Sequence, residues 1–278
     1  MIRTAPEGLR RQLIGLGGVV ERNAYLVKRY AIWEVTWFVW TVANTLTIVF
    51  IAKGVAAAGG SLDVKRETTV LLIGAVIWSY LGILFEILTQ TVGWERWEGT
   101  IEYTFMAPLS RAVHLLGMGA FAVVYGLLRT AALFGVIASF FDVQLDRADF
   151  WAAFVVLAVA SVSFLGVGVM TAVFPLISPE KGTQLGFIAQ GMLLVVSGVY
   201  YSVSVLPGWM QVVSKISPAT YALRGIRDAI LNGAGVGALW GDIWPLLVIG
   251  VVSIPLGFAV FHRGEIYAKR HGMLKRSG

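Results

Sequence analysis

Six separate stretches of this sequence are long and apolar enough to cross a lipid bilayer, and they constrain the fold more than any other feature. A transmembrane helix needs about 20 predominantly apolar residues. The stretches occupy residues 33–52, 69–90, 113–139, 150–174, 184–205 and 243–262. Only 14% of the residues are charged, against about 25% in an average soluble domain. We therefore predict an all-α membrane protein in which residues 1–278 form a single domain with six transmembrane helices.

Lysine and arginine residues gather on one side of this predicted bundle. Six spans put both termini on the same side, and that side holds most of the 22 Lys and Arg residues. Because positive charge accumulates in cytoplasmic loops, we predict that both termini are cytoplasmic. The net charge of +6 then indicates contact with anionic membrane lipids rather than with nucleic acid. The chain has no cysteine, which excludes disulfides and thiolate metal sites.

Residues 1–32 predict a cytoplasmic interfacial helix that lies along the membrane. Apolar residues recur at steps of three and four, whereas the basic residues fall elsewhere around the helix. The apolar positions are Leu9, Leu13, Leu16, Val20, Ala24 and Val27. A soluble helix that packs on a partner protein is the alternative interpretation.

Residues 93–112 form a polar segment between the second and third spans. A helix over 94–106 would place Glu95, Glu98 and Glu102 on one face and a set of apolar side chains on the neighbouring face. The apolar set is Trp94, Trp97, Ile101 and Phe105. Three carboxylates at this spacing repel one another, so they favour a cytoplasmic docking surface for a basic partner. A solvated helix face without a partner is the alternative.

Residues 206–242, before the last span, predict an outer re-entrant hairpin of two short helices. Ser217 and Pro218 predict the start of the second helix, with serine as its cap. Asn232 and Gly233 predict its end. One apolar stripe runs along it: Tyr221, Ala222, Leu223, Ile226, Ala229 and Ile230.

Two motifs in these segments resemble the signatures of ABC type-2 exporter permeases. The first comprises Glu95, Gly99-Thr100, Glu102 and Pro108-Leu109-Ser110, directly before an apolar span. The second runs from Ser217 to Arg227, before the last span. The resemblance implies that the first segment is a coupling helix received by a cleft of an ATPase subunit. Its coupling residues would be Glu95, Glu98, Gly99, Thr100, Glu102 and Pro108, and the matching hairpin residues are Pro218, Tyr221, Arg224 and Arg227.

The same resemblance implies the partners and the cargo class. The chain would be the permease of an ATP-driven exporter in a bacterial-type cell membrane, moving a hydrophobic or amphipathic drug, antibiotic or lipid-like substrate. Cytosolic ABC ATPase subunits would carry the ATP and Mg²⁺, and a second permease, identical or a sister chain, would complete the path. The sequence itself has no P-loop motif for nucleotide phosphates and no catalytic motif set, so the chain is not expected to be an enzyme or to bind a cofactor. The Ser/Leu/Gly, Trp and Pro pattern of polysaccharide exporters at the first span is missing, which disfavours a glycan cargo.

Several aromatic and ionisable residues in the spans are candidates for a substrate path: Trp37, Trp40, Arg129, Tyr200 and Tyr201. An interfacial aromatic belt is the alternative for the aromatic residues. Arg129 lies in the outer part of its span, where we expect it to snorkel or to pair with an outer aspartate, and attraction of an anionic ligand is the alternative. Glu34 and Glu86 are expected near the inner boundary, at a different depth from Arg129. The three histidines have no metal-ligand spacing.

Two other classes of protein compete with the exporter interpretation. An ion-gradient-driven secondary transporter or channel would carry carboxylates at mid-membrane or broken helices in paired repeats, and the sequence shows neither. A lipid-modifying membrane enzyme would need a catalytic set that we do not find. Transport without any ATPase would favour the gradient-driven alternative.

Overall fold

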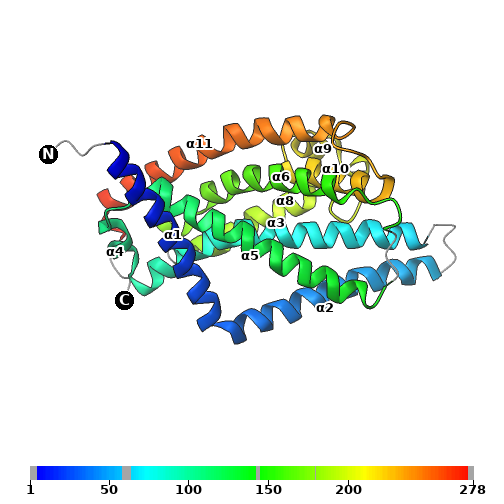
Figure 1. Ribbon diagram of the computed structural model, residues 1–278, viewed down its shortest axis with the longest axis horizontal. Coiled ribbons are helices and arrows are strands. Elements are labelled where there is room, and N and C mark those ends of the chain that lie inside the picture. Colours follow the sequence, from blue (N-terminus) through cyan, green and yellow to red (C-terminus); the bar gives the residue numbers. More distant parts are fainter. Residues whose placement is uncertain (1–4, 58–63, 142–144, 179, 275–278) are drawn as a thin grey trace.

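The computed structural model describes residues 5–57, 64–141, 145–178 and 180–274, and these form helices that run side by side along one axis (Figure 1). In chain order they are α1 (Ala5–Arg29), α2 (Ala31–Ala57), α3 (Val64–Glu98), α4 (Ile101–Met106), α5 (Arg111–Ala138), α6 (Phe150–Thr171), α7 (Val173–Ile177), α8 (Gly182–Val196), the 3-10 turn η1 (Val203–Val205), α9 (Gly208–Ser214), α10 (Pro218–Asn232) and α11 (Trp240–Arg270). One end of the bundle holds α1, α4 and the last turns of α11, whereas α9 and α10 lie toward the other end (Figure 1).

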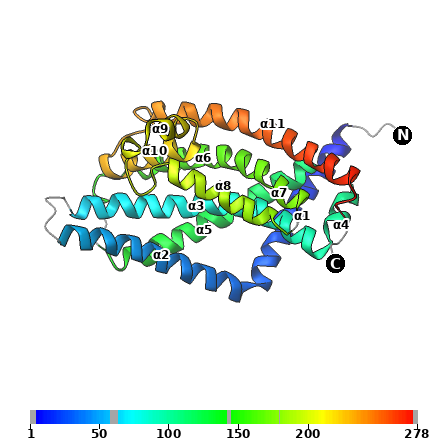
Figure 2. The same cartoon turned by 180° about the vertical axis from the view of Figure 1, so that it is seen from behind.

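Five helical segments of the described chain are long and apolar enough to cross a membrane, at 31–51, 65–98, 111–138, 150–177 and 240–270. The predicted fifth span, 184–205, is wrong in its extent. α8 has only 15 residues and ends at Val196, and it packs along α3 as seen from behind in Figure 2. Gly198 follows in the left-handed region, with φ at 68°, a conformation that glycine adopts without steric cost. The chain therefore turns there instead of continuing the helix.

The second span is longer than predicted, and this changes the polar segment that follows it. α3 has 35 residues and continues to Glu98, so the predicted single helix over 94–106 is wrong. No proline interrupts residues 90–98, and the first left-handed residue is Gly99, with φ at 75°. The polar segment therefore consists of the last two turns of α3, a sharp corner and the six-residue helix α4.

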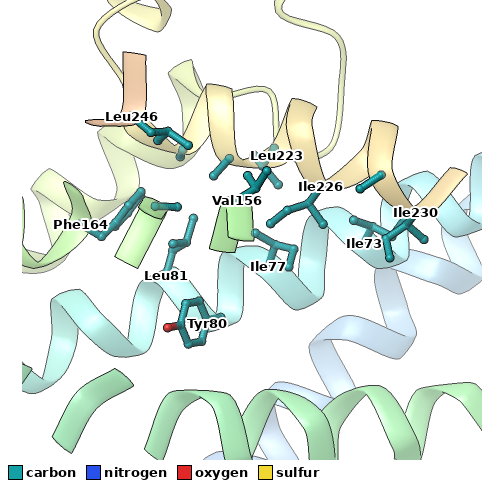
Figure 3. Close-up of a cluster of buried hydrophobic side chains, with 14 of the residues drawn as sticks. Ile73, Ile77, Tyr80, Leu81, Val156, Phe164, Leu223, Ile226, Ile230 and Leu246 are labelled. Atoms are coloured by element: carbon teal, nitrogen blue, oxygen red, sulfur yellow. The ribbon is translucent and has the colours of Figure 1, made fainter. Parts of the chain in front are cut away.

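A buried apolar cluster joins α10 to the membrane-spanning helices (Figure 3). Leu223 and Ile226 of α10 point toward Ile77 of α3 and Val156 of α6 (Figure 3). Burying a side chain of this size stabilises the fold by about 1.5–3 kcal/mol. The predicted apolar stripe is thus the face by which α10 packs into the core. The helix begins at Pro218 as predicted, but the Ser217 side chain contacts Ser197 Oγ at 2.8 Å instead of capping α10.

Small residues allow α6 and α11 to pack closely over much of their length. A Cβ atom added to Gly166 of α6 would lie 2.1 Å from Ser253 Oγ of α11, and one added to Gly257 of α11 would lie 2.7 Å from the Gly166 carbonyl oxygen. Ser163 Oγ donates to the Leu246 carbonyl at 2.6 Å. This small-residue interface is typical of helix packing within membranes, where close approach replaces a hydrophobic driving force.

α1 packs one narrow face on α5 and leaves much of its apolar surface exposed. Val19 and Asn23 are buried, and a Cβ atom added to Gly117 of α5 would meet Val19 Cβ at 2.8 Å. Leu9 and Leu13, in the predicted apolar stripe, are more than 60% exposed, as expected for a helix that contacts lipid. Of the predicted segment 1–32, residues 1–4 lie outside the described chain.

α2 is the least enclosed of the long helices, because only 11% of its apolar span is buried. Four of its polar side chains bond to its own backbone. Thr36, Thr41, Asn44 and Thr47 each donate to the carbonyl oxygen four residues earlier, at 2.8–2.9 Å. Such bonds satisfy a polar group in lipid without a second helix.

Candidate functional site

α4 is held to the bundle by the side chain of Arg111, the first residue of α5. Its Nη2 donates to the Phe105 carbonyl at 2.7 Å and its Nη1 to the Thr104 carbonyl at 3.4 Å. Carbonyls in the last turn of a helix lack intrahelical partners, so Arg111 satisfies this end of α4. Its Nε also donates to Glu265 Oε1 of α11 at 3.1 Å, and Lys269 Nζ contacts the same oxygen at 2.6 Å. One guanidinium group therefore links α4, α5 and α11.

Glu95, near the end of α3, is buried in an ion cluster. Only 2% of its side chain is exposed. Its Oε1 accepts a hydrogen bond from Arg22 of α1, and its Oε2 lies 3.7 Å from His114 Nε2 of α5. A buried carboxylate is costly unless it is paired, and here α1 and α5 supply the partners. The expected cytoplasm-facing position of Glu95 is therefore wrong, and the side chain instead joins three helices.

The other two carboxylates of the segment are exposed, as predicted. Glu98 ends α3 and Glu102 lies in the first turn of α4. Trp97 and Tyr103 stand beside them with about 70% of their area exposed, and Pro108 is exposed as well. We call these five residues the α4 surface. It combines negative charge with aromatic area, a combination that suits a protein partner.

The corner between α3 and α4 is fixed rather than loose. Gly99 supplies the left-handed conformation, and Thr100 Oγ1 donates to the Glu95 carbonyl at 3.4 Å. Ile101 is fully buried. These contacts set the direction in which α4 leaves α3, so a displacement of α4 acts on the end of α3.

A cavity of about 740 Å³ lies between α1, α2, α3, α5 and α8. Four of the five residues predicted for a substrate path line it: Trp37, Trp40, Arg129 and Tyr200. Tyr201 is not in the cavity lining, and its hydroxyl donates to the Val195 carbonyl of α8. The volume is within the range of small-molecule sites, about 300–1,000 Å³.

Arg129 lies beside Glu34 in the cavity, with 3.5 Å between Nη1 and Oε2. Tyr125 donates its hydroxyl hydrogen to the same carboxylate. We expected Glu34 at a different depth from Arg129, and this expectation is wrong. Glu34 is in the first turn of α2, whereas Arg129 is about five turns into α5. The two meet because α1 crosses obliquely and α2 begins well along the length of α5 (Figure 1).

The predicted hairpin residues hold α10 between its neighbours. Arg224 pairs with Asp242 of α11, and Arg227 donates to the carbonyls of Gly198 and Val199, just beyond α8. Burial lowers the pKa of Arg227, and the nearby charge of Glu67 opposes this shift. Tyr221 donates to the Lys215 carbonyl at 2.7 Å. These contacts fix the hairpin and place none of its four predicted residues in the cavity.

The residues at the α4 end that the sequence predictions did not place in the site include Arg22, Arg111, His114 and Glu265. Each acts through a partner that is distant along the chain, so no local spacing marks the pair. The Glu265–Lys269 step of four residues is a helical ion-pair pattern that marks a polar end of α11. No comparable signal points to Arg22 or His114.

Comparison with known proteins places most of the chain in one family. The sequence profile described as "ABC-2 type transporter" matches residues 23–231. The "probable multidrug ABC transporter permease YbhR" of Escherichia coli is 22% identical over 205 residues, which are 73% of this chain and 54% of that protein. The "linearmycin resistance permease protein LnrN" of Bacillus subtilis is 26% identical over 106 residues, which are 38% of this chain and 27% of that protein. The chain therefore spans about half the length of the Escherichia coli relative.

Proposed function

Since this chain belongs to the ABC-2 type transporter family, we propose that it is the membrane permease of an ATP-driven exporter for hydrophobic or amphipathic substrates. The observation that carries the proposal is the α4 surface, whose exposed carboxylates and aromatic rings lie on α4 and the end of α3, together with the contacts of Arg111 and Glu265 that tie α4 to two membrane-spanning helices. The multidrug and antibiotic-resistance names of the relatives favour a drug-like cargo. The termini and the α4 surface are assigned to the cytoplasmic side, where the basic residues gather.

In this proposal separate ABC ATPase subunits contact the α4 surface and bind the ATP and Mg²⁺. Closure of the ATPases moves α4, and each contact passes the motion to a different helix. Arg111 passes it to α5 and α11, the corner at Gly99 passes it to α3, and the Glu95–Arg22 pair passes it to α1. A second permease, placed against the exposed faces of α2 and α8, completes the path. Nucleotide and substrate then each stabilise one of two states of the bundle.

Reversal of the two exposed carboxylates tests the proposed docking. We expect the double variant Glu98→Lys, Glu102→Lys to retain membrane insertion but to capture about tenfold less of the ABC ATPase that copurifies with the wild-type chain, because like charges across an interface cost several kcal/mol. Copurification from membranes measures capture, and ATP-driven uptake into inverted vesicles measures transport. Asp146→Lys, an exposed reversal outside the α4 surface, is the control and should leave both unchanged.

Two results would contradict the proposal. One is full ATPase capture and transport by the double variant. The other is transport driven by an imposed ion gradient in vesicles that contain no ABC ATPase, which would favour a secondary transporter.

A further inference from the structure

The cavity described above is lined by more carboxyl than guanidinium side chains. Four glutamates and two arginines line it: Glu34, Glu86, Glu95, Glu98, Arg22 and Arg129. Arg22 is already paired with Glu95, and Arg129 with Glu34. Each guanidinium group therefore has a direct carboxylate partner, and neither forms an ion pair with Glu86 or Glu98, although the charge of Arg129 also acts on Glu86. An anion entering the cavity would meet this excess of like charge.

Glu86 is the remaining carboxylate that lies deep in the cavity. It is in the middle of α3 and accepts a hydrogen bond from Gln90, one turn later. That partner is a neutral amide, so it orients the carboxylate without neutralising it. Glu98, by contrast, lies at the exposed end of α3. Arg129 acts on Glu86 only from a distance, and no ion pair to Glu86 is formed among the described residues, so a positive group that reached this carboxylate would gain a direct partner.

The remaining wall of the cavity is strongly aromatic. Trp33, Trp37, Trp40, Trp78 and Trp94 all line it. Tryptophan faces attract organic cations through their quadrupole, most strongly where water is excluded. The rings also supply apolar area for the uncharged body of a ligand. Aromatic walls and an uncompensated carboxylate thus favour the same ligand chemistry.

We propose that this cavity binds hydrophobic organic cations of small-molecule size, with Glu86 facing the positive charge and the tryptophan rings contacting the apolar body. The inference rests on the proposed function, because it takes the cavity to be the substrate path. It adds the sign of the substrate charge and the residue that selects it. Because Glu34 is already paired with Arg129, Glu86 is the carboxylate that dominates the selection of the substrate charge.

Two probes of nearly equal size and opposite charge test this inference. Radiolabelled tetraphenylphosphonium and tetraphenylborate are equilibrated by dialysis with the purified full-length permease, and uptake by protein-free micelles is subtracted. We expect the wild-type chain to bind the phosphonium more tightly than the borate. Glu86→Gln, which can still accept the Gln90 hydrogen bond, should weaken phosphonium binding by about tenfold and should not weaken borate binding.

Matched variants separate charge from misfolding. Glu86→Asp retains the carboxylate and should keep the preference for phosphonium, and Glu21→Gln removes an exposed carboxylate outside the cavity lining and should bind as the wild-type chain does. Failure of the wild-type chain to prefer phosphonium, or full phosphonium affinity in Glu86→Gln, overturns the inference. Binding requires no ATPase, so intact phosphonium selectivity without ATP-driven transport would count against the proposed function alone. ATP-driven transport without charge preference would count against this inference alone.

Discussion

Replacement of Glu95 by alanine is expected to abolish transport and to lower the thermal stability of the purified permease. The substitution leaves buried His114 without its carboxylate and leaves Arg22 of α1 without a partner. Breaking a buried ion pair costs about 3–5 kcal/mol, and because 38% of the Arg22 side chain is exposed, we expect about 3 kcal/mol here. Thermal unfolding in detergent measures the stability, and ATP-driven uptake into vesicles measures the loss of transport.

Glu98→Ala is the matched control for stability, because Glu98 lies one turn after Glu95 and is exposed. It should unfold at the wild-type temperature. Arg22→Ala should have a smaller effect than Glu95→Ala, since the carboxylate would still face His114. Wild-type stability in Glu95→Ala would show that the ion cluster does not hold α1 to the bundle.

Replacement of Gly166 by leucine is expected to prevent correct assembly of the bundle. The new Cβ atom alone would lie 2.1 Å from Ser253 Oγ and 2.7 Å from the Ser253 carbonyl carbon, so backbone as well as side chain must move. Overpacking of a core commonly costs about 1–3 kcal/mol, and a clash along the α6–α11 interface should exceed that range. The yield of monodisperse protein on size-exclusion chromatography measures the effect, and we expect it to fall at least about tenfold.

Gly135→Leu is the control for this substitution. Gly135 also lies within a membrane-spanning helix, α5, but nothing lies within 4 Å of a Cβ atom built there. The variant should be obtained at the wild-type yield. A well-behaved, active Gly166→Leu protein would show that α6 and α11 can separate without loss of function.

The architecture could be predicted because lipid imposes a simple rule on sequence. A span must be apolar for about 20 residues, and this rule places α2, α3, α5, α6 and α11 correctly. The rule does not locate a helix end where the apolar pattern and the backbone conformation change at different residues. The apolar residues after Val196 suggested a longer fifth span, yet the backbone turns at Gly198. The polar residues after Gln90 suggested a new helix, yet no residue before Gly99 ends α3.

The candidate site was predictable in its location but not in its contacts. The motif containing Glu95 and Glu102 pointed to the segment that contains α4 and its exposed carboxylates, and four of the five aromatic and basic candidates line one cavity. The partner of each charge depends on how helices are shifted along one another, which a single sequence does not encode locally. The oblique course of α1 therefore produced the error for Arg129 and Glu34, and the turn at Gly99 produced the error for Glu95.

The self-contained hydrogen bonding of α2 has a mechanical consequence. Because Thr36, Thr41, Asn44 and Thr47 donate to the backbone of their own helix, these four donors stay satisfied wherever the helix moves. Displacing α2 breaks dispersion contacts, the Glu34–Arg129 pair and the hydrogen bonds from Tyr125 to Glu34 and from Arg129 to Thr41, but it leaves none of these four donors unsatisfied in hydrocarbon. The interhelical hydrogen bonds described for α2 lie at Glu34 and Thr41, so the rest of this cavity wall can yield to a bulky guest without breaking any of them.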